Sequence, residues 1–284
     1  MNAPGKYIDV GGFKRHVVCQ GNGFPVVLEA GLTAMSSCWA WVQENLAKDH
    51  LVLSYDRPGL GFSEASRERR TAQQIAVELH DLLEALNFPR PFLFVGHSMG
   101  GIISRAFHKL YPKELAGAVL IDPAHPDQLH RDHDIKRTLF QFFLFLVSMH
   151  CLSAARLVHW TGDFGLSEQA AGLPEENCRH AEYFFRNKGH LRETVREARE
   201  WMESRRFVGD HRFGTLPLTV ITAAEKTTGC WGELQREIAA LSSRGKQFVL
   251  EGSTHVSLLT DRRYAERIAE EARRMAGFLG RPAV

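Results

Sequence analysis

A serine flanked by glycines is the residue of this sequence best placed to act as a nucleophile. The segment Gly96-His97-Ser98-Met99-Gly100 follows the apolar run "PFLFV" and precedes a stretch with helical periodicity. A tight turn from strand to helix strains its central residue and requires small residues two positions away. Such a bend would hold the Ser98 hydroxyl clear of the strand. It would also direct the Met99 amide at an oxygen that develops negative charge nearby.

A serine hydroxyl is a weak nucleophile at neutral pH, so this chemistry also needs a base within hydrogen-bond reach. Histidine is suited to the task because its pKa lies near the working pH. The sequence has 14 histidines. His97 lies inside the turn, where we expect it to pack beside Ser98 and to help line a substrate pocket. His255 follows the last predicted strand, in a Gly-Ser-Thr-His loop.

The elements around these residues alternate between short apolar runs and segments with helical periodicity. Strands are predicted in "HVVCQ", "FPVVLEAG", "LVLSYD", "PFLFVG", "AGAVLI", "LPLTVITAA" and "KQFVLEG". Helices are predicted over 40–46, 71–86, 102–111, 232–242 and 262–279. This alternation favours an α/β fold with a mostly parallel sheet and helices on both faces. Residues 126–213 have helical patterns without a convincing strand. We therefore predict a core formed by residues 1–125 and 214–284, with 126–213 inserted as a helical cap over the carboxyl edge of the sheet.

Several sequence blocks resemble those of α/β-hydrolase-fold enzymes, in the usual order and at the usual spacing of that superfamily. Besides the glycine-flanked serine, they are "LEAGLTAMSSCW", "YDRPGLGFS", "VLIDPAHP" and "EGSTHVSLL". The resemblance covers nearly the whole chain and is greatest to the lid-bearing, esterase- and lipase-like serine hydrolases. It implies that His255 is the base. It also implies that Asp56 and Arg57 belong to a turn that braces the sheet.

The resemblance further implies an oxyanion hole made of two backbone amides. Met99 would supply one, and Leu32, in the loop after an early strand, would supply the other. Gly31 would allow the substrate to approach closely. The histidine usual in that loop is replaced here by Ala30, which changes the support of the loop but leaves its amide in place.

Two residues remain candidates for the acid that orients the base. Many members of the superfamily carry an aspartate after the strand represented here by "LTVIT", where this chain has Glu225 instead. Asp122 follows the strand "AGAVLI", a position that carries the acid in some members. Asp122 could alternatively cap the turn "DPAHP". We favour Asp122 and keep Glu225 as the alternative.

These residues together predict hydrolysis of carboxylic esters through an acyl-enzyme, with no cofactor and no metal. The serine at position 98 argues against the haloalkane dehalogenase and epoxide hydrolase branches, which carry aspartate there. Amides, lactones and C–C bonds can be cleaved by the same three groups. A ligand-binding or receptor member of the fold with little turnover is the alternative from another class. His125, His130 and His133 cluster among carboxylates, but their spacing matches no metal-ligand pattern.

Composition limits the partners. The net charge of +2 gives no reason to expect nucleic acid, and we expect a small-molecule ester as substrate. The five scattered cysteines and an N-terminal segment without a signal-like apolar core favour the cytoplasm. The Phe-rich segment 138–160 is expected to form a pair of cap helices, in which Phe140 and Phe143 either line an apolar acyl pocket or only hold the cap together. Contact of this cap with a lipid surface is a less favoured alternative, and the oligomeric state is left open.

Overall fold

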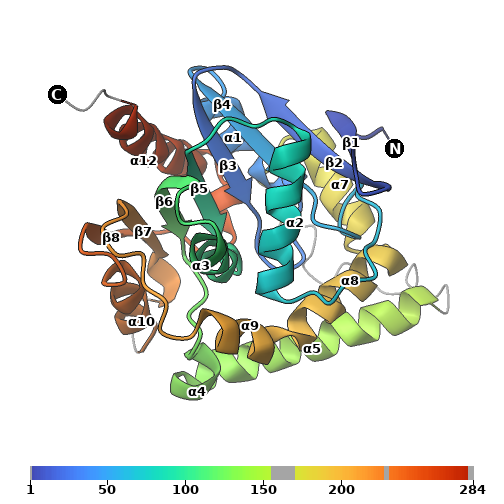
Figure 1. Ribbon diagram of the computed structural model, residues 1–284. Helices are drawn as coiled ribbons and strands as arrows, with labels where there is room; N and C mark the ends of the chain where they lie inside the picture. The colour runs from blue at the N-terminus through green and yellow to red at the C-terminus, as the bar shows by residue number, and fades with distance from the viewer. Residues whose placement is uncertain (1, 155–169, 227–229, 281–284) are drawn as a thin grey trace.

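The computed structural model describes residues 2–154, 170–226 and 230–280, and an eight-stranded sheet lies at the centre of this part of the chain (Figure 1). The strand order is β1-β2-β4-β3-β5-β6-β7-β8. β2 pairs antiparallel with β1 and β4, and all other neighbouring strands pair in parallel. The strands are β1 (Lys6–Val10), β2 (Phe13–Gln20), β3 (Phe24–Glu29), β4 (His50–Tyr55), β5 (Phe92–His97), β6 (Leu115–Ile121), β7 (Leu218–Ala223) and β8 (Gly245–Leu250).

Helices cover both faces of the sheet, as the alternating pattern predicts. One face packs against α2 (Ala72–Ala85), α3 (Gly100–Leu110) and α10 (Cys230–Ala239), and the other against α1 (Ala40–Leu46) and α12 (Arg262–Leu279). Side chains of successive residues in β3 point to opposite faces of the sheet. Val27 packs on the face covered by α2, α3 and α10, and Val26 and Leu28 pack on the face covered by α1 and α12. The predicted fold class is therefore confirmed.

The sequence pattern did not predict the first strand, β1. β1 lies at the edge of the sheet, and three of its five residues are exposed, so it has no apolar run that would mark it as a strand. It pairs with β2 through a turn at Gly11 and Gly12, whose φ angles are +62° and +85°. Only glycine adopts two such values in succession without strain, and a Gly-Gly pair is a hairpin signal.

The chain between β6 and β7 is helical in its described residues. It contains α4 (Gln128–Arg131), α5 (His133–Ala154), α7 (Glu175–Phe184), α8 (Lys188–Arg199) and α9 (Trp201–Val208). α5 and α8 lie side by side (Figure 1), joined by the packing of Leu146 on Leu191 and Val195. The division into a core and a cap at residues 126 and 213 stays a prediction.

The predicted helix pair over 138–160 differs from what is observed. Residues 138–154 belong to one continuous helix, α5, and 155–160 lie outside the described residues. None of the helices in the described ranges combines the length and the apolar character that crossing a bilayer requires.

Three short elements complete the fold at the carboxyl edge of the parallel strands. They are the 3₁₀ helices η1 (Ser36–Trp39) and η3 (Ala224–Lys226) and the one-turn helix α11 (Ser257–Thr260). Ser98, Asp122 and Glu225 follow β5, β6 and β7, and His255 lies five residues beyond β8. Because the carboxyl ends of parallel strands meet at one edge of a sheet, the fold gathers these side chains there.

Candidate active site

Ser98 occupies the turn between β5 and α3 in a left-handed conformation, with a φ of +53°. Such a conformation is unfavourable for a residue with a Cβ and persists only where its surroundings enforce it. Here Ser98 N donates to Ile121 O at 3.0 Å, and Ser98 O accepts from Gly101 N and Ala124 N at 2.9 and 2.8 Å. These bonds tie the strained residue to β6 and to the first turn of α3.

The flanking glycines are required by close backbone contacts. A Cβ on Gly96 would lie 2.9 Å from Gly100 O, and one on Gly100 would lie 2.7 Å from Glu29 O. At both distances the carbon and the oxygen would clash. A larger residue at either position would therefore push β3, β5 and α3 apart. This is the steric reason that the sequence pattern anticipates.

Asp122 and His255 are joined side chain to side chain. His255 Nδ1 and Asp122 Oδ2 are 2.6 Å apart. The other carboxylate oxygen, Oδ1, accepts from Trp231 Nε1 at 2.9 Å and from Ala223 N at 3.2 Å. Asp122 is fully buried, and burial alone would raise its pKa. The hydrogen bond and charge of His255, with the donors Trp231 and Ala223, instead lower the pKa of Asp122 below its ordinary value.

Glu225, the alternative acid, contacts the backbone of His255. Its Oε1 accepts from His255 N at 2.7 Å. Of the two carboxylates that the sequence leaves as candidates, Asp122 therefore meets the imidazole ring, and Glu225 holds the loop that carries it. Trp231 was not anticipated, because a tryptophan at the start of α10 has no local feature that links it to Asp122, 109 residues away.

His97 connects the serine turn with the His255 loop. Its Nε2 donates to His255 O at 3.0 Å, and the two rings lie 4.5 Å apart between centroids. Gly31 lies against the same turn, since a Cβ built on it would be 3.0 Å from Ser98 Cβ and 3.1 Å from His97 Nδ1. His97 and Gly31 thus pack behind Ser98, and neither is among the residues that line the adjoining cavity.

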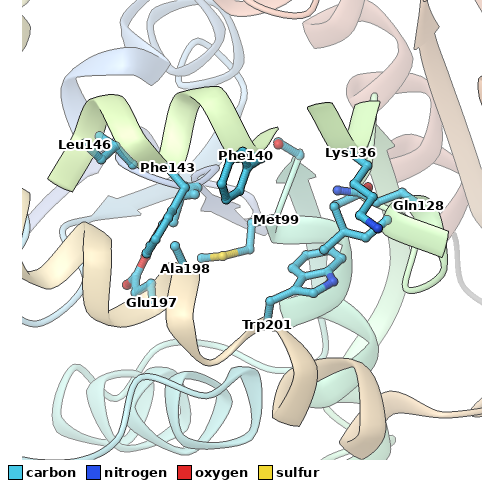
Figure 2. A pocket seen from close by; sticks show the side chains of 13 residues that line it. Met99, Gln128, Lys136, Phe140, Phe143, Leu146, Glu197, Ala198 and Trp201 are labelled. Carbon is cyan, nitrogen blue, oxygen red and sulfur yellow. The ribbon is translucent and has the colours of Figure 1, made fainter. Parts of the chain in front are cut away.

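A cavity of about 320 Å³ opens beside Ser98, Met99 and Leu32. Its walls are predominantly apolar. Figure 2 shows Phe140 and Phe143 on α5 near Met99, with Trp201 on α9 completing the lining. The two phenylalanines that the sequence predicts as pocket residues therefore do line a cavity next to Ser98. Lys136 and Gln128 lie near Trp201 at one side of it (Figure 2).

Arg57 has a more specific place than the sheet-bracing role that the sequence suggests. It is buried, and its Nη1 and Nη2 donate to Ala30 O and Gly31 O at 2.7 and 2.8 Å. The peptide that follows Gly31 is trans and planar, so a carbonyl held toward Arg57 directs the N–H of Leu32 to the opposite side. Arg57 therefore fixes the orientation of the Leu32 amide.

The same guanidinium ties this loop to α8. Arg57 Nε and Nη2 donate to the two oxygens of Glu197, both at 2.9 Å, and Nη1 donates to Glu29 Oε1 at 2.7 Å. Burial alone would lower the pKa of Arg57, but Glu197 and Glu29 raise it above its usual value, so the group stays charged. Glu197 lies in the cavity wall with both oxygens bound to Arg57. Sequence reasoning missed this pair because its members are 140 residues apart.

A sequence model of the alpha/beta hydrolase family matches residues 26–270 of this chain. Among curated proteins, the chain is similar to the uncharacterized protein YqjL of Bacillus subtilis, at 33% identity over 127 residues, and to an AB hydrolase superfamily protein of Gibberella zeae, at 35% over 109 residues. The matched segments cover 42% and 37% of this chain and 50% and 34% of those proteins. The match thus spans half or less of each relative.

Solved structures with the same fold include two enzymes. The Cif epoxide hydrolase from Acinetobacter nosocomialis superposes with a TM-score of 0.77 at 18% identity, covering 97% of this chain and 90% of that one. A thermophilic esterase from Thermogutta terrifontis gives 0.65 at 21% identity, covering 95% and 98%. At sequence identities of 18% and 21%, these similarities show only that the fold is shared. The family match, however, extends from β3 into α12 and includes the turn at Ser98 and the loop at His255, so the chain belongs to the alpha/beta hydrolase family.

Proposed function

We propose that this chain hydrolyses carboxylic esters through an acyl-enzyme formed on Ser98. The observation that carries the proposal is the 2.6 Å contact between His255 and the buried Asp122, at the sheet edge where the strained Ser98 lines a cavity. An imidazole whose Nδ1 is held by a carboxylate presents Nε2 as an acceptor for a hydroxyl proton. Amide, lactone and C–C hydrolysis, and ligand binding with little turnover, are the alternatives that the tests below address.

In the proposed reaction, the Ser98 oxygen attacks the ester carbonyl carbon while its proton passes to His255 Nε2. Asp122 keeps the other ring proton on Nδ1 and balances the charge that the ring gains. The N–H groups of Met99 and Leu32 donate to the oxyanion. Collapse of the tetrahedral intermediate breaks the C–O bond, and the departing alcohol takes the proton from His255. A water molecule then repeats these steps and releases the acid.

The nature of the nucleophile limits the reaction class. A hydroxyl that attacks a carbonyl gives an acyl ester, which water can hydrolyse at the same carbon. Opening an epoxide or displacing a halide through a covalent intermediate would instead form an alkyl bond to the protein, which a serine would retain as a stable ether. The apolar cavity beside Ser98 suits an ester with an alkyl or aryl group, because both oxygens of Glu197 in its wall are already bound by Arg57.

A labelling experiment combined with a substrate panel tests the proposed function. We expect a fluorophosphonate probe to modify Ser98 and to block hydrolysis of p-nitrophenyl esters in the same proportion. The panel should include esters of increasing chain length, a matched anilide and a lactone, and we expect the esters to give the highest kcat/KM. Absence of labelling would favour the ligand-binding alternative. A preference for the anilide or the lactone would change the substrate class while leaving the nucleophile in place.

A change at Arg57 tests whether it positions the oxyanion loop. In Arg57→Lys, the charge remains but the planar group that reaches both carbonyls and Glu197 is lost. We expect kcat to fall about 10- to 100-fold with little change in KM, because the Leu32 amide acts mainly in the transition state. Affinity for a boronic acid inhibitor, whose adduct with Ser98 carries the same oxyanion, should fall by a similar factor.

Arg70→Lys is the matched control for this change. Arg70 is equally buried, and its Nη2 lies 3.7 Å from Glu197 Oε1, but its Nη1 donates to Glu78 Oε2 and it donates to neither carbonyl of the loop. We expect Arg70→Lys to lower stability without changing boronic acid affinity. Equal loss of that affinity in both variants would mean that Arg57 has only a general structural role.

A further inference from the structure

A second cavity, of about 640 Å³, lies between α3, α9 and α10. Its walls come from α3, the segment 125–127 after β6, α9, the segment 209–212 and α10. It shares no lining residue with the cavity beside Ser98. Four arginines from three parts of the chain line it: Arg105, Arg205, Arg206 and Arg212.

Arg105 is the buried member of this group, with only 4% of its surface exposed. Its Nη2 donates to Gly209 O at 2.8 Å and to His211 O at 2.9 Å. Within the described ranges, its Nε and Nη1 have no hydrogen-bond partner, and the guanidinium forms no ion pair. A buried charge of this kind is unfavourable unless an opposite charge compensates it.

The surroundings of Arg105 do not supply that compensation. Burial lowers the pKa of Arg105 to about 10, and Asp210 and Asp127 offset the effect only in part. The neighbouring His211 has its pKa lowered to about 4 by burial and by the positive charges of His108, Arg105 and Lys109. The surroundings of Arg105 and His211 therefore disfavour any additional positive charge.

The carboxylates that line the cavity are mostly engaged by other arginines. Asp127 accepts from Arg205 Nε and Nη2 at 3.0 and 2.7 Å, and Glu237 accepts from Arg131 Nη1 at 2.8 and 2.6 Å. Asp210 lines the cavity without an ion pair to the described residues. The exposed Arg212 uses Nη2 on Ala240 O and also forms no ion pair there.

We propose that this cavity binds the carboxylate or phosphate group of a small anionic ligand, with Arg105 as its buried anchor and Arg212 as a second donor at the rim. A guanidinium with unused N–H groups matches the oxygens of either anion and can donate two hydrogen bonds in parallel. The bound charge would complete the compensation of Arg105 that Asp210 and Asp127 supply only in part. This site is independent of the chemistry at Ser98.

Thermal unfolding in the presence of simple anions tests the site. The wild-type protein is titrated with inorganic phosphate and, separately, with succinate, and sodium chloride keeps the ionic strength constant. We expect a saturable rise in Tm with one of the two probes, because a ligand that binds only the folded state stabilises it. A response to phosphate alone identifies a phosphate site, and a response to succinate alone identifies a carboxylate site.

Variants decide whether the response comes from this cavity. In Arg105→Met, which keeps an unbranched apolar side chain but removes the guanidinium, we expect the half-saturating concentration to rise about tenfold or more. Arg212→Gln, at an exposed position, should weaken binding less and decides the question if Arg105→Met does not fold. Arg263→Gln, an exposed arginine of α12 that pairs with Asp261, is the control and should titrate like the wild type. The proposal is overturned if neither probe gives a saturable shift, or if Arg105→Met and Arg212→Gln titrate unchanged.

Discussion

Ser98→Ala is expected to lower kcat/KM for ester hydrolysis by about 10⁴-fold or more. The variant removes the only atom that forms the acyl bond in the proposed reaction, and no neighbouring group in the turn can replace it. Fluorophosphonate labelling should disappear together with the activity. Initial rates on the best p-nitrophenyl ester and the mass of the labelled protein are the two measurements.

Two further serine variants separate loss of the nucleophile from damage to the fold. Ser104→Ala changes a fully buried serine of α3 whose hydroxyl donates to Gly101 O at 2.8 Å and which lines neither cavity, so it should retain activity and labelling. Ser98→Gly should be as inactive as Ser98→Ala but melt at a higher temperature, because glycine adopts a φ of +53° without strain. Activity that survives in Ser98→Ala would mean that the nucleophile lies elsewhere.

The features of this structure that the sequence predicts are those indicated by residues that are neighbours in the chain. The turn at Ser98 follows from five consecutive residues, because Gly96 makes room for the backbone of Gly100 in the same turn and Gly100 makes room for the adjoining strand at Glu29 O. The parallel sheet follows from apolar runs that are covered on both faces. β1 lacks such a run, and only the Gly11-Gly12 turn could have indicated it.

The less predictable part depends on contacts between distant segments. Sequence reasoning left Asp122 and Glu225 open, because both follow neighbouring parallel strands and end at the same edge of the sheet. Which carboxylate meets the His255 ring depends on how the His255 loop turns back over that edge. The bond between Arg57 and Glu197 likewise depends on the packing of α8, which no spacing in the sequence encodes.

The pKa of Asp122 gives a stability test of its pairing with His255. The pKa of Asp122 is lower in the folded state than in the unfolded chain. The ionised carboxylate therefore stabilises the folded state at pH values above its ordinary pKa of about 3.9. That contribution is lost as the pH falls through the lower, folded-state pKa. The difference in unfolding free energy between the wild type and Asp122→Asn should therefore be fully present near neutral pH and shrink below about pH 4.

Asp122→Asn is also expected to lower kcat by about 10³- to 10⁴-fold, whereas Glu225→Gln should have a much smaller effect. Two N–H donors, from Trp231 and Ala223, face Oδ1 of Asp122, so the single oxygen of an asparagine would take that position. Its NH₂ group would then face His255 Nδ1 and force that nitrogen to accept a hydrogen bond. The ring proton would move to Nε2, where the ring could no longer take the proton of Ser98.

Glu225→Gln keeps an oxygen that can accept from the His255 backbone N–H, so the loop should stay in place and the tautomer should not change. The pH profile distinguishes the two variants further, since only a changed tautomer should lower kcat across the whole neutral range without shifting KM. If Glu225→Gln loses activity by orders of magnitude while Asp122→Asn stays near the wild-type rate, Glu225 is the acid. The hydrogen bond between Asp122 and His255 would then serve stability alone.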